Sequence, residues 1–281
     1  RADGFSLLGY YGILPPEAWA PAAREAAGRA LELGPNLAET HNAIAQVALL
    51  HDWDWPATER AFRQALELNP GYLQAAAWYG LLYQGLVCGR WAEATATLLE
   101  ASRREPLSAY AAACLAFGLG YGGRLAEGVR MAERAVELDA SSFLSQWALQ
   151  NTLYVAGQHA RSIEVGERLL PASGRHPWVL FNLVVALADA GDHAAARAVS
   201  DELNARGQRE YVSPFHRGVC ALFVGDIDAG TDLVREAILR RDPTIPLFVR
   251  WSSSHPALRG LAVMPEAVAA SNLPIAFGAH S

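Results

Sequence analysis

Apolar and polar positions along the chain follow a helical pattern that returns every 34 residues. Long apolar segments such as WYGLLYQGLVC and FNLVVALADA are each followed by a helical segment rich in Ala, Glu and Arg. A glycine separates the two segments, and these glycines keep one spacing: Gly89, Gly123, Gly157, Gly191 and Gly225. Because glycine adopts the left-handed conformation that ends a helix, the pattern predicts one helix–turn–helix unit repeated along an α-solenoid.

The repeat divides the chain into three predicted parts, which together form an all-α, right-handed α-α superhelix of about six to seven repeats. Residues 1–37 are a partial N-terminal repeat, with helices expected over 2–12 and 21–33. Residues 38–243 hold six repeats, and the first has one extra residue in its aromatic turn, HDWDWP. Residues 244–281 lose the pattern, so we expect an irregular capping segment there with a short helix over 265–272.

The spacing of large and small residues within each unit resembles the tetratricopeptide repeat. The match is fullest at Trp78, Leu81, Gly89, Trp91, Ala94, Leu98, Ala101 and Pro106, preceded by Phe62, Ala65 and Pro70 in the repeat before. In this family, small residues of the second helix let the two helices of a repeat approach closely. Gly128, Ser162 and Gly230 depart from the pattern, because each replaces an expected alanine. The resemblance implies a fold, and a fold alone does not determine function.

Four segments carry a narrower resemblance. LLGYYGILPPE, HDWDWPATERAFRQALELNP, REYVSPF and SSHPALRGL are similar to the repeat region that lies C-terminal to effector domains in bacterial regulators. Those effectors are serine/threonine kinases, adenylate cyclases and winged-helix transcription factors. The resemblance implies that this chain is the regulatory part of a larger bacterial protein, with an effector domain upstream of Arg1.

Composition and charge exclude several classes of partner. The chain has a formal net charge of −6 and no basic run, whereas binding to a nucleic-acid backbone needs clustered Lys and Arg. The longest apolar run, residues 178–188, is shorter than the ~20 residues that span a bilayer. Cys88, Cys114 and Cys220 are too few and too scattered for a disulfide framework or a zinc site. We therefore expect no nucleic-acid or membrane partner for this segment and a cytoplasmic location.

Motifs for catalysis, metal binding or cofactor binding are missing from the sequence. It has no P-loop, nucleophile elbow, HExxH pair or CxxC pair, and GLGYGG at 118–123 lacks the strand and the full spacing of a dinucleotide site. Asp52 and Asp54 are expected as turn and N-cap residues. His159 and His193 occupy equivalent turn positions and are expected in solvent. We expect no cofactor, no metal and no catalytic residue.

The candidate binding surface is the inner face of the superhelix. In tetratricopeptide proteins the first helix of each repeat lines the concave face, and residues four apart share one face of a helix. Counted from the repeat glycines, the inner positions are mostly aromatic and nearly uncharged: Asn42, Gln46, Tyr79, Tyr83, Tyr110, Phe117, Tyr121, Trp147, Asn151, Tyr154, Trp178 and Phe181, continued by Val185 and Phe215. Aromatic rings offer a large contact area at little cost in rotamer entropy, so this stripe is predicted to bind a peptide or a partner helix.

Other functions stay open at this point. The rings could instead fill the core of a tightly wound superhelix, or a neighbouring copy could cover them. The leading hypothesis is a non-catalytic interaction module. The alternative is a small-molecule-sensing or enzymatic domain in the concave pocket, and an enzyme would need titratable groups that converge there. Apolar faces at the solenoid ends also predict possible self-association.

Overall fold

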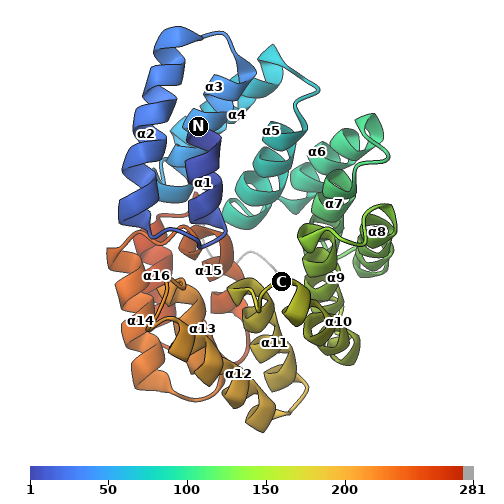
Figure 1. The fold of residues 1–281 in the computed structure, drawn as a ribbon, viewed down its shortest axis with the longest axis vertical. Helices are drawn as coiled ribbons and strands as arrows, with labels where there is room; N and C mark the ends of the chain where they lie inside the picture. The colour runs from blue at the N-terminus through green and yellow to red at the C-terminus, as the bar shows by residue number, and fades with distance from the viewer. Residues whose placement is uncertain (275–281) are drawn as a thin grey trace.

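The computed structural model describes residues 1–274, which are almost entirely helical and contain no strand (Figure 1). The N-terminal part holds α1 (Ala2–Tyr10) and α2 (Pro16–Leu33). Six helix pairs follow: α3 (Ala38–Val47) with α4 (Trp55–Leu68), α5 (Leu73–Ala77) with α6 (Trp91–Arg104), α7 (Ala109–Tyr121) with α8 (Leu125–Leu138), α9 (Phe143–Val155) with α10 (His159–Ala172), α11 (Pro177–Asp189) with α12 (His193–Arg206), and α13 (Pro214–Phe223) with α14 (Ile227–Leu239). Two helices, α15 (Ile245–Ser254) and α16 (Val263–Ser271), complete the described chain. The predicted α-α superhelix is confirmed.

The repeat glycines end the first helices as the sequence predicts. Gly89, Gly123, Gly157, Gly191 and Gly225 have φ angles of 70°, 83°, 72°, 86° and 86°. At these angles a side chain would clash with the neighbouring backbone, so glycine is favoured at each position. These glycines, 34 residues apart, therefore lie where the chain reverses direction between the two helices of a repeat.

The first helices of two repeats widen into π-helix, a feature that the sequence pattern does not predict. η1 (Ala48–Asp52) extends α3, and η2 (Trp78–Val87) extends α5. A π-turn closes with an i→i+5 hydrogen bond and so holds one more residue than an α-turn. In the first repeat, η1 and the left-handed Trp53, at φ 54°, accommodate the extra residue of the aromatic turn. Asp54 then caps α4 by accepting a hydrogen bond from the Ala57 amide at 2.9 Å, as predicted.

Both ends of the chain contain more helix than expected. α2 begins at Pro16 rather than at residue 21, because proline fits the first turn of a helix, where its missing N–H needs no partner. Near the C-terminus, α16 covers most of the expected short helix, and α15 is an additional helix that the sequence pattern does not predict. Residues 275–281 of the expected capping segment lie outside the described residues.

Residues that depart from the tetratricopeptide pattern lie at close helix contacts. A methyl group added at Gly128 would come within 2.9 Å of the Gly120 amide nitrogen on α7, so the backbones of α7 and α8 are too close for alanine. The hydroxyl of Ser162 donates a hydrogen bond to the Gln150 carbonyl at 2.8 Å, again between paired helices. Small side chains at these positions therefore keep the role that alanine has in other repeats.

The two ends of the solenoid meet, so that the helices form a closed ring (Figure 1). Arg240, after α14, forms an ion pair with Glu17 of α2 at 2.6 Å. Arg241 donates to the carbonyls of His51 and Asp52 at 3.2 and 3.0 Å. α15 runs through the interior of the ring and packs against η2. α1 and α15 both pack against helices that lie far from them in the sequence.

Among the helices of residues 1–274, none combines the length and the apolar character that crossing a bilayer requires.

Candidate functional site

The twelve inner-face residues singled out from the sequence are almost all buried. Ten of them have at most 8% of their surface exposed, and Tyr110 and Tyr121 are partly exposed. The structure divides them into four local groups rather than one continuous stripe. Two groups come from α7, α9 and α11, and the other two come from η2 and α3.

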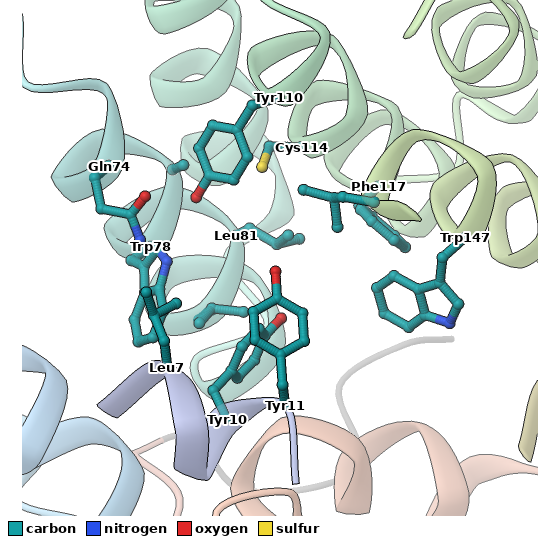
Figure 2. A pocket seen from close by; sticks show the side chains of 13 residues that line it. Leu7, Tyr10, Tyr11, Gln74, Trp78, Leu81, Tyr110, Cys114, Phe117 and Trp147 are labelled. Carbon is teal, nitrogen blue, oxygen red and sulfur yellow. The ribbon is translucent and has the colours of Figure 1, made fainter. Parts of the chain in front are cut away.

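The first group surrounds a cavity of about 230 Å³ beneath α1. Figure 2 shows its rings projecting from opposite sides: Tyr10 and Tyr11 from α1, Trp78 from η2, Tyr110 and Phe117 from α7, and Trp147 from α9. The rest of the wall consists of smaller and aliphatic side chains: Leu7, Leu81, Leu82, Leu144, Ala77, Gln74 and Cys114. The cavity is thus formed mainly by aromatic rings and aliphatic side chains.

Tyr10 and Tyr11 bind α1 to rings that lie far apart in the sequence. The Tyr10 ring lies 5.1 Å from Trp78 and 4.9 Å from Trp178, and the Tyr11 ring lies 5.0 Å from Trp178, measured between centroids. Trp147 continues the cluster at 4.7 Å from Trp178. Such pairs add about 0.5–1.5 kcal/mol each beyond their buried area. Sequence reasoning missed Tyr10, Tyr11 and Trp78, although the adjacent tyrosines before Gly12 were a visible signal.

The second group lies under α15. Tyr121, Asn151, Tyr154 and Phe181 surround a narrow gap that Phe248 and Trp251 of α15 close. The Trp251 ring lies 6.0 Å from Tyr154 and 6.1 Å from Phe181, and Phe248 lies 6.1 Å from Phe181. α15 is therefore an amphipathic helix with its aromatic face against the predicted stripe.

A polar contact holds the end of α15 in place. Asp189 Oδ2, at the end of α11, accepts a hydrogen bond from the Tyr154 hydroxyl at 2.8 Å and lies 3.1 Å from His255 Nε2. Burial acts to raise the pKa of the Asp189 carboxyl, but the hydrogen bonds from His255 and Tyr154 outweigh it and hold the pKa below its usual value. The ionised carboxylate therefore links the end of α11 to α9 and to the end of α15.

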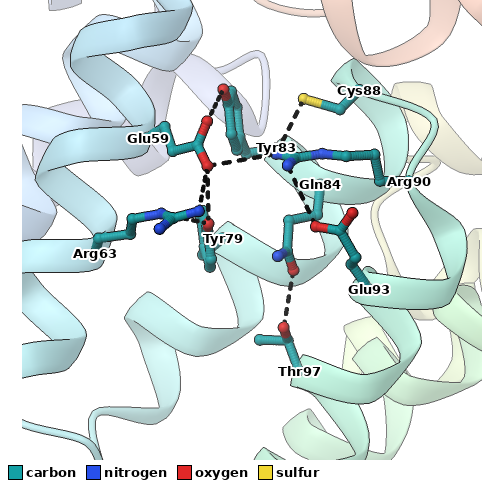
Figure 3. A network of polar contacts seen from close by, with 9 residues as sticks. All are labelled: Glu59, Arg63, Tyr79, Tyr83, Gln84, Cys88, Arg90, Glu93 and Thr97. Carbon is teal, nitrogen blue, oxygen red and sulfur yellow. Dashed lines mark hydrogen bonds and ion pairs between the residues drawn. The ribbon is translucent and has the colours of Figure 1, made fainter.

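The third group, Tyr79 and Tyr83, does not line the cavity. Figure 3 shows both hydroxyls turned toward Glu59 of α4, at 3.4 and 3.1 Å from its carboxylate oxygens. Arg63 forms an ion pair with the same carboxylate at 2.8 Å. Burial acts to raise the pKa of Glu59, and the bonds from Arg63 and Tyr83 lower it below its usual value. These tyrosines connect η2 to the preceding repeat.

The fourth group, Asn42 and Gln46, lies on α3 under α1. Asn42 Nδ2 donates to Asp3 Oδ1 at 3.3 Å. Both residues are fully buried, and the Gln46 amide has no hydrogen-bond partner within residues 1–274. These amides are thus covered by the chain's own N-terminal helix.

The cavity offers an apolar contact surface but no charged side chains that could act in catalysis. The cavity wall formed by residues 1–274 includes no Asp, Glu, His, Lys or Arg. In the same part of the chain, no three His, Cys, Asp or Glu side chains are arranged to hold a metal ion. The polar clusters at Glu59 and Asp189 tie helices together through carboxylates that are already paired.

Comparisons with known proteins identify the fold. No family model and no curated protein matches the sequence. A tetratricopeptide repeat protein from Parabacteroides merdae is similar in structure, with a TM-score of 0.59 and 12% identity over 96% of this chain and 98% of that one. PilW, a type IV pilus biogenesis factor, has a TM-score of 0.54 and 16% identity over 74% and 94% of the two chains. Pseudomonas aeruginosa PilF gives 0.50 and 19%, over 74% and 93%. This chain therefore has the fold of a tetratricopeptide-repeat solenoid.

Proposed function

We propose that this chain is a non-catalytic protein-interaction module whose aromatic inner face binds an apolar peptide or partner helix. The observation that carries the proposal is the position of α15. This helix lies inside the ring with Phe248 and Trp251 against Phe181 and Tyr154, which is how an amphipathic helix occupies a hydrophobic groove. The inner face thus holds one helix already, and a partner helix of similar chemistry would replace it.

The context of the module follows from its resemblance to bacterial regulators. We propose that it is the regulatory part of a larger cytoplasmic protein, in which partner binding is transmitted to an upstream effector domain. The net charge of −6 and the lack of a basic run argue against a nucleic-acid partner. Self-association through the solenoid ends stays a prediction, and it would compete with contacts such as Arg240–Glu17 that join the ends within one chain.

We call the surface under α15, which includes Tyr154 and Phe181, the α15 groove. A labelled synthetic peptide of residues 244–256, which includes α15, tests whether this groove binds a helix. The full chain is titrated with this peptide and binding is followed by fluorescence anisotropy. Trp251→Ala in the protein weakens the hold of its own α15 and leaves the inner face intact, so the groove is free for a larger fraction of the time. We expect this variant to bind the peptide roughly tenfold more tightly than the unmodified chain.

Two further variants make the peptide experiment specific. Phe181→Leu, combined with Trp251→Ala, removes a ring from the groove and should cancel most of the gain in affinity for the peptide. Leu239→Ala removes an apolar side chain that is 85% exposed on α14 and should change nothing. Circular dichroism checks that each variant is folded. If the folded Trp251→Ala variant binds the peptide no better than the unmodified chain, the groove assignment is wrong.

A further inference from the structure

We propose that the cavity beneath α1 is an aromatic cage for a methylated ammonium group, such as the trimethylammonium head of choline or of trimethyl-lysine. This inference goes beyond the proposed function, because it concerns a different part of the interior from the α15 groove. It rests on the six rings around the cavity, on the uncharged wall and on the cavity's size.

The rings form walls on several sides of the space rather than one flat surface. They come from α1, η2, α7 and α9, so segments more than 130 residues apart contribute to one cage (Figure 2). Adjacent rings meet at steep angles: 70° between Tyr10 and Tyr11, 47° between Tyr10 and Trp78, and 49° between Phe117 and Trp147. A tetrahedral group of methyls can touch such walls on several sides at once.

The electrostatics of this wall favour a cation over an anion. The face of an aromatic ring carries partial negative charge and attracts cations within about 6 Å of its centroid, most strongly where water is excluded. The wall contains no Arg that would repel a cation. The net charge of −6 acts in the same direction at longer range.

The lack of a carboxylate in the wall selects the kind of cation. A metal ion or a primary ammonium holds its water strongly and needs charged or polar ligands when it is buried. A trimethylammonium group spreads its charge over methyls, which can contact both the rings and Leu7, Leu81 and Leu82. The wall therefore fits a methylated ammonium better than a metal ion or an unmodified lysine.

Size and access are consistent with a small group. The cavity of about 230 Å³ is below the ~300–1,000 Å³ of pockets that enclose drug-sized molecules. Tyr10, Tyr11, Tyr110, Leu7 and Gln74 are partly exposed, so the cavity has an edge that faces solvent. A head group can enter from that edge while the rest of a small molecule or of a lysine side chain stays outside.

Choline and its neutral isostere, 3,3-dimethylbutan-1-ol, test the cage directly. The two molecules have nearly the same shape and differ in charge, so their comparison separates attraction to a cation from hydrophobic burial. The full chain is titrated with each at constant ionic strength, and tryptophan fluorescence and calorimetry report binding. We expect choline to bind at least about tenfold more tightly than the isostere. Equal binding of the two, stronger binding of the isostere, or no binding of choline would overturn the proposal.

Matched tryptophan variants locate the site. Trp147→Leu removes a wall of the cage and should weaken choline binding by about tenfold. Trp91→Leu is the control, because Trp91 stacks on Tyr121 at 5.3 Å and does not line the cavity. If the control weakens choline binding as much as Trp147→Leu, the cage assignment is wrong. The choline and isostere comparison on the unmodified chain holds even if a variant fails to fold.

A third titration distinguishes the source of the group. A short peptide with trimethyl-lysine is compared with the same peptide carrying unmodified lysine. If choline binds and the trimethylated peptide binds more tightly than choline, the result supports the cage and points to a modified protein as the ligand. Binding of choline alone supports it and points to a free small molecule. Equal binding of the two peptides contradicts selection for the methylated group. The outcome is independent of the α15 peptide titration, so either proposal can fail alone.

Discussion

The indole Nε1 of Trp55 donates a hydrogen bond to the carbonyl of Asn272 at 2.7 Å, although 217 residues separate the two. It also lies 3.2 Å from the Ser271 carbonyl. Trp55 opens α4 near the start of the chain, and Asn272 follows α16 near its end. This contact joins the two ends of the solenoid, and the ion pair between Glu17 and Arg240 joins them at a second place.

Trp55→Phe tests what this contact contributes. The substitution removes the N–H and also makes the buried ring smaller, so we expect Trp55→Phe to cost about 0.5–1.5 kcal/mol more unfolding free energy than the same change at a buried tryptophan without this hydrogen bond. Trp19→Phe is the matched control, because the Trp19 ring is fully buried and its indole N–H has no hydrogen-bond partner in the described residues. Urea unfolding of both variants measures the difference. If Trp19→Phe costs as much as Trp55→Phe, the hydrogen bond to Asn272 is not what stabilises the closure.

Two glycine-to-alanine substitutions, at positions where the added methyl group meets no other atom, should change the stability of the fold in opposite directions. Gly157 has a φ of 72° and Gly28 lies in the middle of α2 with ordinary helical backbone, and nothing lies within 4 Å of a methyl added at either. Gly157→Ala should destabilise the fold by about 1–2 kcal/mol through backbone strain. Gly28→Ala should stabilise it by about 0.5–1 kcal/mol, because alanine favours the helix. Thermal or urea unfolding checks both. Equal signs for the two would contradict the role given to the repeat glycines.

Acid should destabilise the fold through a buried histidine. Burial, helped by nearby His176, lowers the pKa of His216 to about 3. The unfolded chain takes up this proton near pH 6.5 and the folded chain does not, so the contribution is present above pH 6.5 and is lost as the pH falls toward 3. At pH 5 this amounts to about 2 kcal/mol.

His216→Phe removes that dependence. The His216 ring packs 4.7 Å from Phe181 and 5.4 Å from Phe248, so a phenyl ring suits the same place. We expect the difference in unfolding free energy between pH 7 and pH 5 to shrink by about 2 kcal/mol in the variant. Urea titrations at the two pH values measure it. An unchanged pH dependence would show that His216 is not held neutral in the folded chain.

The thiols should be unreactive in the folded chain. Cys88, Cys114 and Cys220 are all buried and free, and burial raises the pKa of each, to about 12 for Cys114. Because the thiolate is the reacting form, a disulfide reagent at pH 8 should modify none of them before unfolding and all three in denaturant. Rapid modification of any thiol in the folded chain would contradict its burial.

Local sequence patterns predicted most helices, because the features that define them lie within one repeat. The glycine spacing located the turns, and Asp54 was identified as a cap from its neighbours alone. The π-helix η2 was not predictable in this way. Counting at 3.6 residues per turn placed Tyr79 and Tyr83 on the inner face, but the wider turn of η2 directs them to Glu59 and leaves Trp78 at the cavity.

The closure of the ring depends on contacts that no local pattern contains. Tyr10 meets Trp178, and Trp251 meets Tyr154, across more than 90 residues of chain. The sequence predicted inner-face positions for the rings between α7 and α11, but it gave no sign that α1 and α15 would pack against them. The role of these rings in binding a partner stays a prediction.

Spin labels at the junction of the two ends test the closed ring most directly. Ala18, beside Glu17 on α2, and Leu239, beside Arg240, are exposed, and each can be changed to cysteine while the native thiols stay buried. The closed ring predicts one short and narrow distance distribution between the labels, because Glu17 and Arg240 are in contact. A long or broad distribution in the folded chain would mean an open superhelix, and it would contradict the account of how α1 and α15 cover the inner face.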